Sequence, residues 1–160
     1  MTSGLGPGRV AGIAVRSAKK GPMRELSRAT AKANGGLVED IRVSPRRGLT
    51  LLSLEQWRET LAELNTELPW HTRRANLLIE GLWLPDCIGR RLAVGEVWLD
   101  ILGETKPCEL MNEYHPGLEQ ALRPGVRAGV HGRVVRGGEI AVGASVEAAP
   151  EEPLEDGRGR

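Results

Sequence analysis

The sequence predicts a mainly β domain that closes into a barrel and carries a few short helices. Three observations predict this class: about seven short apolar runs, glycine-rich turns between them, and one stretch of clear helical periodicity. A barrel is expected because closure removes the exposed edges that an open sheet would leave. With 160 residues, 40% of them hydrophobic, the chain is long enough for one packed domain.

The first part of the chain predicts strands separated by turns. Residues 1–8 are expected to be disordered, and the apolar run 10–15 predicts the first strand. Residues 23–33 fit either a helix face or an edge strand, and the strand is favoured. A polar stretch that ends at Arg47 predicts a loop, and 48–52 then predicts a short buried strand.

One helix is expected at 54–64. Ser53 is a suitable N-cap residue, and Gln56 three positions later completes the pattern of a capping box, with its side chain reaching back. Asn65 is expected to end the helix. The apolar residues that recur at helical spacing are Leu54, Trp57, Leu61 and Leu64.

The second part predicts further strands and one helical turn. Strands are expected at 75–79, 91–94, 96–102, 129–135 and 140–146, and a helical turn at 118–122. Gly137-Gly138 predicts a two-residue hairpin turn between the last two strands. The folded domain is expected to span 9–147, followed by a disordered tail at 148–160.

Charge and apolar content limit the classes of partner and compartment. The net charge is +1, so the overall balance does not point to nucleic acid. No apolar run approaches the roughly 18 residues of a membrane helix, and the N-terminus does not resemble a signal peptide. The expectation is a cytoplasmic protein that does not bind membranes, with both of its 2 cysteines reduced. Its 4 tryptophans are compatible with a homodimer.

Cys108 is the candidate catalytic residue. A reactive cysteine must be a thiolate, which is favoured by exposure and by cationic neighbours, and Lys106 lies two residues away. Thiolate sulfur binds soft metals and can also carry an extra sulfur atom as a persulfide. The alternative is a buried structural cysteine, the commoner role of an arbitrary cysteine, although the polar flanks of Cys108 weaken it. Cys87 has no basic neighbour as close, and packing is expected for it.

Arg73, Arg74 and Asn76 are candidate ligands for an anionic heterocycle. Two arginines before a strand can clamp a phosphate, and an asparagine side chain offers both a donor and an acceptor. The alternative is a solvated strand start in which Asn76 makes a turn bond. Arg47 belongs to a weaker arginine pair, and Asp40 could orient that pair or make a turn bond.

Other common sites are not indicated. The 3 histidines and 2 cysteines lack the short spacings of a zinc site. The sequence also has neither the Gly-x-Ser-x-Gly of many hydrolases nor a glycine-rich nucleotide loop ending in Lys-Ser or Lys-Thr.

Taken in order, these segments resemble the MOSC domain, the family named after the C-terminal domain of molybdenum cofactor sulfurase. The resemblance covers roughly residues 9–147, and each motif is weak alone while the ordered set is specific. The matching segments are 36–40, 48–53 with Glu55 and Trp57, 73–78 with Gly81, Leu82 and Leu84, 88–96, Pro107-Cys108 before Met111, 129–135 and 137–143. The chain departs from the family pattern at Glu39, where a glycine is usual, and has no histidine soon after Asp40.

The resemblance implies a MOSC-type β-barrel that binds the molybdenum cofactor, a phosphorylated pterin whose dithiolene holds molybdenum. It implies that Cys108 is a molybdenum ligand or a sulfur carrier, and that Arg74 and Asn76 line the pocket. Arg73, Asp40, Arg47 and Lys106 complete the expected cofactor-binding set. The family as a whole is also associated with pyridoxal phosphate binding.

Three hypotheses for the function remain open. The first is cofactor binding with Cys108 as metal ligand or persulfide carrier in sulfur transfer. The second is a molybdoenzyme that reduces N-hydroxylated compounds, and the third is a non-catalytic module that stores or carries the cofactor. Because only a MOSC-like domain is recognised, sulfur or electrons are expected from a donor protein in trans.

Overall fold

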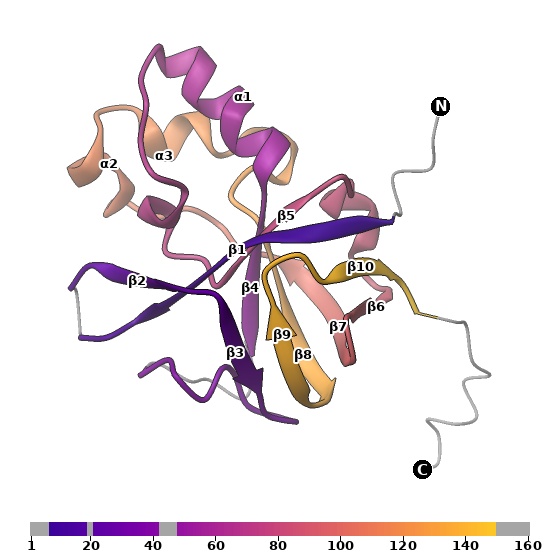
Figure 1. The fold of residues 1–160 in the computed structure, drawn as a ribbon. Helices are drawn as coiled ribbons and strands as arrows, with labels where there is room; N and C mark the ends of the chain where they lie inside the picture. Colours follow the sequence, from indigo (N-terminus) through magenta and orange to yellow (C-terminus); the bar gives the residue numbers. More distant parts are fainter. Residues whose placement is uncertain (1–6, 19–20, 42–47, 150–160) are drawn as a thin grey trace.

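The structure is a computed structural model that describes residues 7–18, 21–41 and 48–149. Short strands dominate it, with a few helices between them (Figure 1). The strands are β1 (Gly8–Arg16), β2 (Met23–Leu26), β3 (Arg28–Ala31), β4 (Leu49–Ser53), β5 (Leu77–Glu80), β6 (Arg91–Val94), β7 (Val97–Glu104), β8 (Val130–Arg136), β9 (Gly138–Ala141) and β10 (Ser145–Ala148). The α-helices are α1 (Leu54–Leu64), α2 (Met111–Tyr114) and α3 (Leu118–Ala121), and the 3-10 helices are η1 (Trp70–Arg73), η2 (Leu84–Cys87) and η3 (Pro124–Val126).

Seven of the described strands form a closed barrel, which confirms the predicted fold class. Their order is β10-β6-β7-β8-β4-β5-β1, and β1 pairs back onto β10 through Gly8 opposite Val146 and Arg9 opposite Ser145. Neighbouring strands are antiparallel except β4 and β5, which are parallel because α1 carries the chain back between them. β2 extends the sheet beyond β1, and β3 and β9 form a separate two-stranded sheet.

The barrel interior is filled by the inward side of each strand. In β7, Val97, Leu99 and Ile101 are buried while Leu102 is exposed, so side chains alternate between the two faces of this strand. A second apolar cluster lies between the barrel and the helices, which gather on one side of it (Figure 1). Its buried members are Leu52, Trp57, Ala75, Leu78, Met111, Leu118, Leu122 and Ala128.

Helix α1 has the predicted bounds, but one half of its predicted capping box is absent. The Ser53 hydroxyl accepts a hydrogen bond from the backbone N–H of Gln56 at 3.1 Å, and Asn65 ends the helix in the left-handed region at φ 52°. The Gln56 side chain does not reach back to Ser53. Its Nε2 instead donates to the Gly125 carbonyl at 2.6 Å, because tertiary packing brings that acceptor over the helix.

The predicted C-terminal hairpin is wrong. The chain turns at Gly137, but β9 pairs with β3 rather than with β8. β7 lines one edge of β8 as far as Arg136, and on the other edge β4 pairs with residues 130–132 while the N–H of Asn34 donates to the Val134 carbonyl at 2.8 Å. The expected single strand 140–146 is therefore two strands, β9 in the small sheet and β10 in the barrel. A turn at Val142 and Gly143 separates them.

Other boundaries differ by a few residues. The ambiguous segment 23–33 forms strands, β2 and β3, which break at Ser27 and enter different sheets. Strand β1 begins at Gly8 and β10 ends at Ala148, one residue beyond the predicted domain at each end. Ala149, in the predicted disordered tail, is buried, and its N–H donates to the Arg91 carbonyl at 2.8 Å. Residues 1–6 and 150–160 of the predicted disordered ends, and residues 42–47 of the predicted loop, lie outside the described residues. Among the helices of the described segments, none combines the length and apolar character that a membrane crossing requires.

Candidate functional site

Cys108 lies on the loop that connects β7 to α2. Residues 105–108 have no regular structure, and the thiol of Cys108 is exposed. The loop is fixed at its start by the N–H of Thr105, which donates to the Gly129 carbonyl at 2.8 Å, and at its end by the N–H of Met111, which donates to the Cys108 carbonyl at 3.0 Å. The reactive atom is therefore open to solvent on a backbone that is held at both ends.

Thr105 is the buried residue of this loop. Its side chain is only 7% exposed, and its hydroxyl has no hydrogen-bond partner within the protein. A buried hydroxyl without a partner is unfavourable, so this group is available to a ligand bound at the loop.

Cys87 has the opposite environment. Its side chain is fully buried in the barrel core, as expected for a packing cysteine, and its thiol lies 3.6 Å from the Trp83 carbonyl. Burial raises the pKa of the Cys87 thiol to about 11, and the cation of Arg90 offsets only part of this effect. Cys87 is therefore a protonated thiol at neutral pH.

Arg73 lies directly under the Cys108 loop. Its side chain is 9% exposed, and its guanidinium donates to three backbone carbonyls. Nε donates to Ala128 at 2.9 Å, and Nη2 donates to Thr105 at 3.2 Å and to Lys106 at 3.5 Å. The side chain of Lys106 is itself exposed beside Cys108.

Arg74 is directed elsewhere because the backbone reverses at this residue. It ends η1 in the left-handed region at φ 66°, an uncommon conformation for a residue other than glycine. Its Nη1 donates to the Gly21 carbonyl at 2.8 Å, and its own carbonyl accepts from Nη2 of Arg16 at 3.3 Å. The two consecutive arginines thus bond to different parts of the protein.

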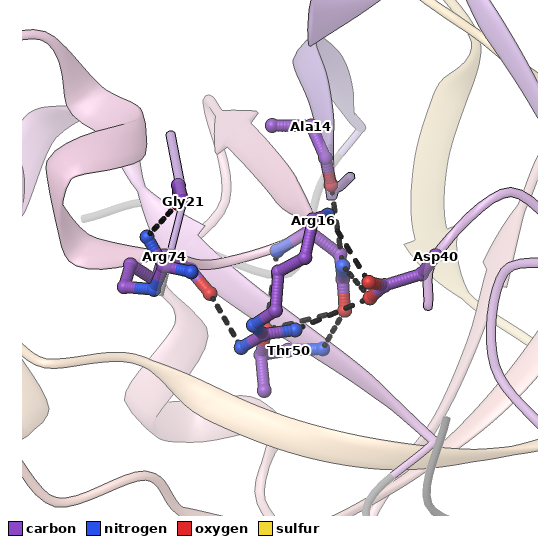
Figure 2. A network of polar contacts seen from close by, with 7 residues as sticks. Ala14, Arg16, Gly21, Asp40, Thr50 and Arg74 are labelled. Atoms are coloured by element: carbon purple, nitrogen blue, oxygen red, sulfur yellow. Dashed lines mark hydrogen bonds and ion pairs between the residues drawn. The ribbon is translucent and has the colours of Figure 1, made fainter. Parts of the chain in front are cut away.

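Asp40 and Arg16 lie at the centre of a polar network (Figure 2), and hydrogen bonds connect Asn76 to it. The Asp40 carboxylate accepts from the backbone N–H of Arg16 at 3.1 Å, from Arg16 Nη1 at 3.2 Å and from Asn76 Nδ2 at 3.0 Å. Asn76 Nδ2 also donates to the Ala14 carbonyl at 3.2 Å, and its Oδ1 accepts from the N–H of Thr50 at 3.2 Å. Both amide hydrogens of Asn76 therefore have acceptors within the protein.

This network and the cysteine loop lie along one outer face of the barrel. Thr50 on β4 is opposite His131 on β8, and His131 is opposite Gly103 near the end of β7. Cross-strand partners share a face of a sheet. The His131 ring also packs against Gly103, where it would lie 3.5 Å from an added Cβ. The face thus runs from Asn76 and Thr50 to the start of the Cys108 loop.

The described site residues fall into two groups, and in both groups their side chains or backbone also bond to other parts of the protein. Asp40, Arg74 and Asn76 share the network, while Arg73 and Lys106 belong to the loop of Cys108. Arg47 lies outside the described residues, so its assignment stays a prediction. The predicted contacts of the other residues with a cofactor also stay predictions.

Arg16 and Glu39 have roles that the sequence did not indicate. Arg16 links Asp40 to Arg74, yet it is 24 residues from Asp40 in the chain, so no local pattern marks it. Its only signal is an arginine at the end of the first strand. Glu39 accepts hydrogen bonds from the N–H of Thr30 at 3.1 and 3.3 Å, which gives this departure from the family pattern a local role.

The donor set suits a group that brings most of its own metal ligands. Within the described residues, no three His, Cys, Asp or Glu side chains gather as a metal site. A dithiolene-bound metal needs only one protein ligand, and the exposed Cys108 can supply a soft sulfur ligand of this kind. The partnerless Thr105 hydroxyl and the exposed Lys106 add polar groups next to it.

An apolar groove of about 490 Å³ lies elsewhere, between α1 and the segment that leads to η1. Its walls include Trp57, Trp70 and Leu78, and Arg58 and Glu67 also line it. Among the described residues, none of the predicted site residues lines this groove.

One family model and several solved structures match this chain. A model of the MOSC domain matches residues 38–147. The solved structure of the YuaD protein from Bacillus subtilis has a TM-score of 0.76 at 18% identity, and the match covers 92% of this chain and 98% of that one. The structure of YiiM from Geobacillus stearothermophilus has a TM-score of 0.72 at 16% identity, and the match covers 90% of this chain and 76% of that one. The structure of YiiM from Escherichia coli has a TM-score of 0.69 at 17% identity, and the match covers 90% of this chain and 71% of that one. At these identities the structural likeness shows the fold alone, and a comparison with curated proteins found no match.

Proposed function

Because the chain belongs to the MOSC domain family, which is associated with the molybdenum cofactor, we propose that it binds this cofactor with Cys108 as the reactive residue. The observation that carries the proposal is the exposed thiol of Cys108 on a loop fixed by backbone hydrogen bonds. A residue that must meet a ligand or a partner protein has to be accessible, and its backbone has to be held in place.

Lys106 and Arg74 are the cationic groups best placed to meet the phosphate of the cofactor. Lys106 is exposed, and Arg74 is half-buried with one nitrogen bonded to Gly21. In the described structure, the Arg73, Asp40 and Asn76 side chains contact protein groups. We infer that these three mainly support the face on which the cofactor lies, and that Thr105 offers its hydroxyl there.

Cys108 can serve the cofactor in two ways. As a ligand, its thiolate would bind molybdenum directly, and the bound cofactor would supply a redox centre for reducing an N-hydroxylated compound. As a carrier, its thiolate would attack the outer sulfur of a persulfide on a donor protein. That step forms an S–S bond at Cys108, breaks the S–S bond of the donor and releases the thiolate of the donor cysteine. Of the two roles, we favour sulfur handling on the bound cofactor. Each role needs a partner protein in trans, as a donor of electrons for the reductase or of sulfur for the carrier.

The decisive experiment measures molybdenum per chain after expression in cells with intact cofactor biosynthesis. We expect molybdenum in the wild-type protein. In Cys108→Ala, which removes the proposed ligand, the molybdenum content per chain should fall by about tenfold or more, the order seen when support for a metal ligand is removed. Cys87→Ala is the matched control and should retain the metal, because the buried Cys87 cannot reach a ligand at the surface.

Mass spectrometry of the Cys108 peptide separates the two modes. An added sulfur atom on Cys108, present in the wild type and transferable to an acceptor thiol, supports the carrier. Molybdenum loss without added sulfur, together with turnover of an N-hydroxylated base, supports the reductase, and bound cofactor with neither result supports a storage module. Equal, near-zero metal in all three proteins, with no added sulfur, would exclude the proposal.

A further inference from the structure

We propose that Arg73 is a positioning residue, which sets the place of Cys108 by holding the backbone of its loop. The sequence assigned Arg73 to phosphate binding together with Arg74. The contacts of the two side chains differ, however, and those of Arg73 lead to the cysteine loop rather than to a free surface.

The guanidinium of Arg73 joins two separate segments of backbone. On one side it donates to the carbonyls of Thr105 and Lys106, the residues that precede Pro107 and Cys108. On the other side it donates to the carbonyl of Ala128, which comes just before β8. The Thr105 N–H closes the same junction by donating to the Gly129 carbonyl at 2.8 Å.

Burial and charge make these contacts strong. Arg73 is 9% exposed, and an arginine is always ionised, so its bonds to the carbonyls are charge-assisted in a largely water-free place. A buried charge is tolerated only when its donors are satisfied, and the carbonyl oxygens satisfy it here. A shorter side chain would leave the Thr105, Lys106 and Ala128 carbonyls without this donor.

The fold provides a reason for the use of arginine at this position. A planar guanidinium offers several donors in fixed directions, so Nε and Nη2 can bond to two chain segments at once. The left-handed backbone of Arg74 then turns the next side chain away, toward Gly21. One member of the arginine pair is thus committed to the loop, and the other remains at the edge of the face that carries the network.

Hydrogen exchange in the full chain tests this role directly. The measured region is the peptide 104–111. In it, the amide of Thr105 donates to the Gly129 carbonyl and the amide of Met111 donates to the Cys108 carbonyl. In Arg73→Ala, exchange in this peptide should be roughly tenfold faster than in the wild type, the scale expected for losing hydrogen bonds to a charged group. Millimolar guanidinium chloride should restore slow exchange by occupying the vacated site, while equal sodium chloride or urea should not.

Arg127→Ala is the matched control. Arg127 is also buried, at 8% exposure, and also donates to a carbonyl, that of Ala121, but its charged partners are Glu59 and Glu63 of α1. This variant should lower the midpoint of thermal unfolding without speeding exchange in 104–111. Should Arg73→Ala fail to fold, Arg73→Lys replaces it, with intermediate exchange expected because an ammonium keeps the charge but not the fork.

Two results would overturn the role of Arg73: unchanged exchange in 104–111 in the Arg73 variant, or equal loosening in Arg127→Ala. The effect on metal binding rests on the proposed function, and there Arg73→Ala should lose severalfold of its molybdenum while Cys108 remains present. A wild type without molybdenum would defeat the proposed function alone, because the exchange and guanidinium measurements need no cofactor.

Discussion

Cys87 and Cys108 differ in exposure, one of the properties that govern thiol reactivity. Cys108 is exposed, while Cys87 is fully buried with a pKa raised to about 11. Because only a thiolate is alkylated rapidly, iodoacetamide at pH 8 should modify Cys108 at least about tenfold faster than Cys87 in the folded protein. Peptide mass spectrometry over time measures both rates.

Urea supplies the control for this comparison. In the unfolded chain both thiols have similar surroundings, so the two rates should converge. Similar rates in the folded protein would show that the environment assigned to Cys87 is wrong.

Single residues also show where sequence reasoning reaches its limit. The polar flanks of Cys108, and the lack of an equally close basic neighbour at Cys87, predicted their different exposure. The doublet Arg73-Arg74 could not be resolved in the same way, since the turn at φ 66° that separates the two side chains is not encoded by a local motif. Arg16 was missed because its partner Asp40 is distant in the chain.

Helix α1 is joined to the segment before β8 by an ion pair whose strength depends on pH. Arg127 Nη2 lies 2.8 Å from Oε2 of Glu63, and this hydrogen bond lowers the pKa of Glu63 below its ordinary value of 4.5. A carboxyl group with a lowered folded pKa stabilises the protein above its unfolded pKa, and the contribution is lost as the pH falls through the folded value. Glu63→Gln should therefore unfold at a lower temperature than the wild type at pH 7.

The difference should shrink as the pH falls from 4.5 through the lowered pKa of Glu63 in the folded protein, because below that value the wild-type carboxyl is protonated as well. Thermal unfolding followed by circular dichroism at several pH values measures this convergence. Glu67→Gln, which removes an exposed carboxylate, should show little difference at any pH. A deficit of Glu63→Gln that persists unchanged in acid would point to packing instead of charge.

Among elements, those with a strong local signal were predicted best. Helix α1 was recovered because its apolar period, its Ser53 cap and its Asn65 end all agree. The hairpin at Gly137-Gly138 failed because a turn signal says that the chain reverses, not which strand it then meets. Next to the turn, β7 lies on one edge of β8 and the N–H of Asn34, from the segment after β3, bonds to Val134 on the other, and the returning strand pairs with β3.

At the scale of the whole molecule, removal of the closing strand β10 tests whether the stability of the fold depends on closure of the barrel. It pairs with β6 through Val146 opposite Val94 and with β1 through Val146 opposite Gly8, so its removal leaves two open edges. Burial of the Val146 side chain alone is worth about 1.5–3 kcal/mol, a large part of a typical stability of roughly 5–15 kcal/mol. A chain that ends after Ala144 should therefore be largely unfolded or insoluble.

A chain that ends after Ala149 is the matched comparison. It keeps β10 and the hydrogen bond from the N–H of Ala149 to the Arg91 carbonyl at 2.8 Å, so it should unfold at the wild-type temperature. Soluble yield and thermal unfolding measure both truncations. Equal stability of the two would mean that β1 and β6 do not need the strand between them.

The sequence predicted the architecture of the whole molecule better than its individual contacts. Short strands and glycine turns predicted the barrel, and the ordered set of weak motifs predicted the MOSC family, both of which are confirmed. The sequence predicted a closed barrel but not which strands close it, because the pairing of β1 with β10 joins residues almost a whole chain apart. Contacts with a cofactor likewise depend on side-chain directions that no spacing in the sequence records.

The same pairing has a consequence for synthesis in the cell. While β10 is still inside the ribosome, β1 and β6 have emerged but the strand between them has not. Both strands then display unpaired backbone groups, which favour pairing with other chains. Contacts between such distant segments also form slowly, because a long loop must close before they can form. The nascent chain is therefore most exposed to aggregation, and most in need of a chaperone, until β10 has emerged.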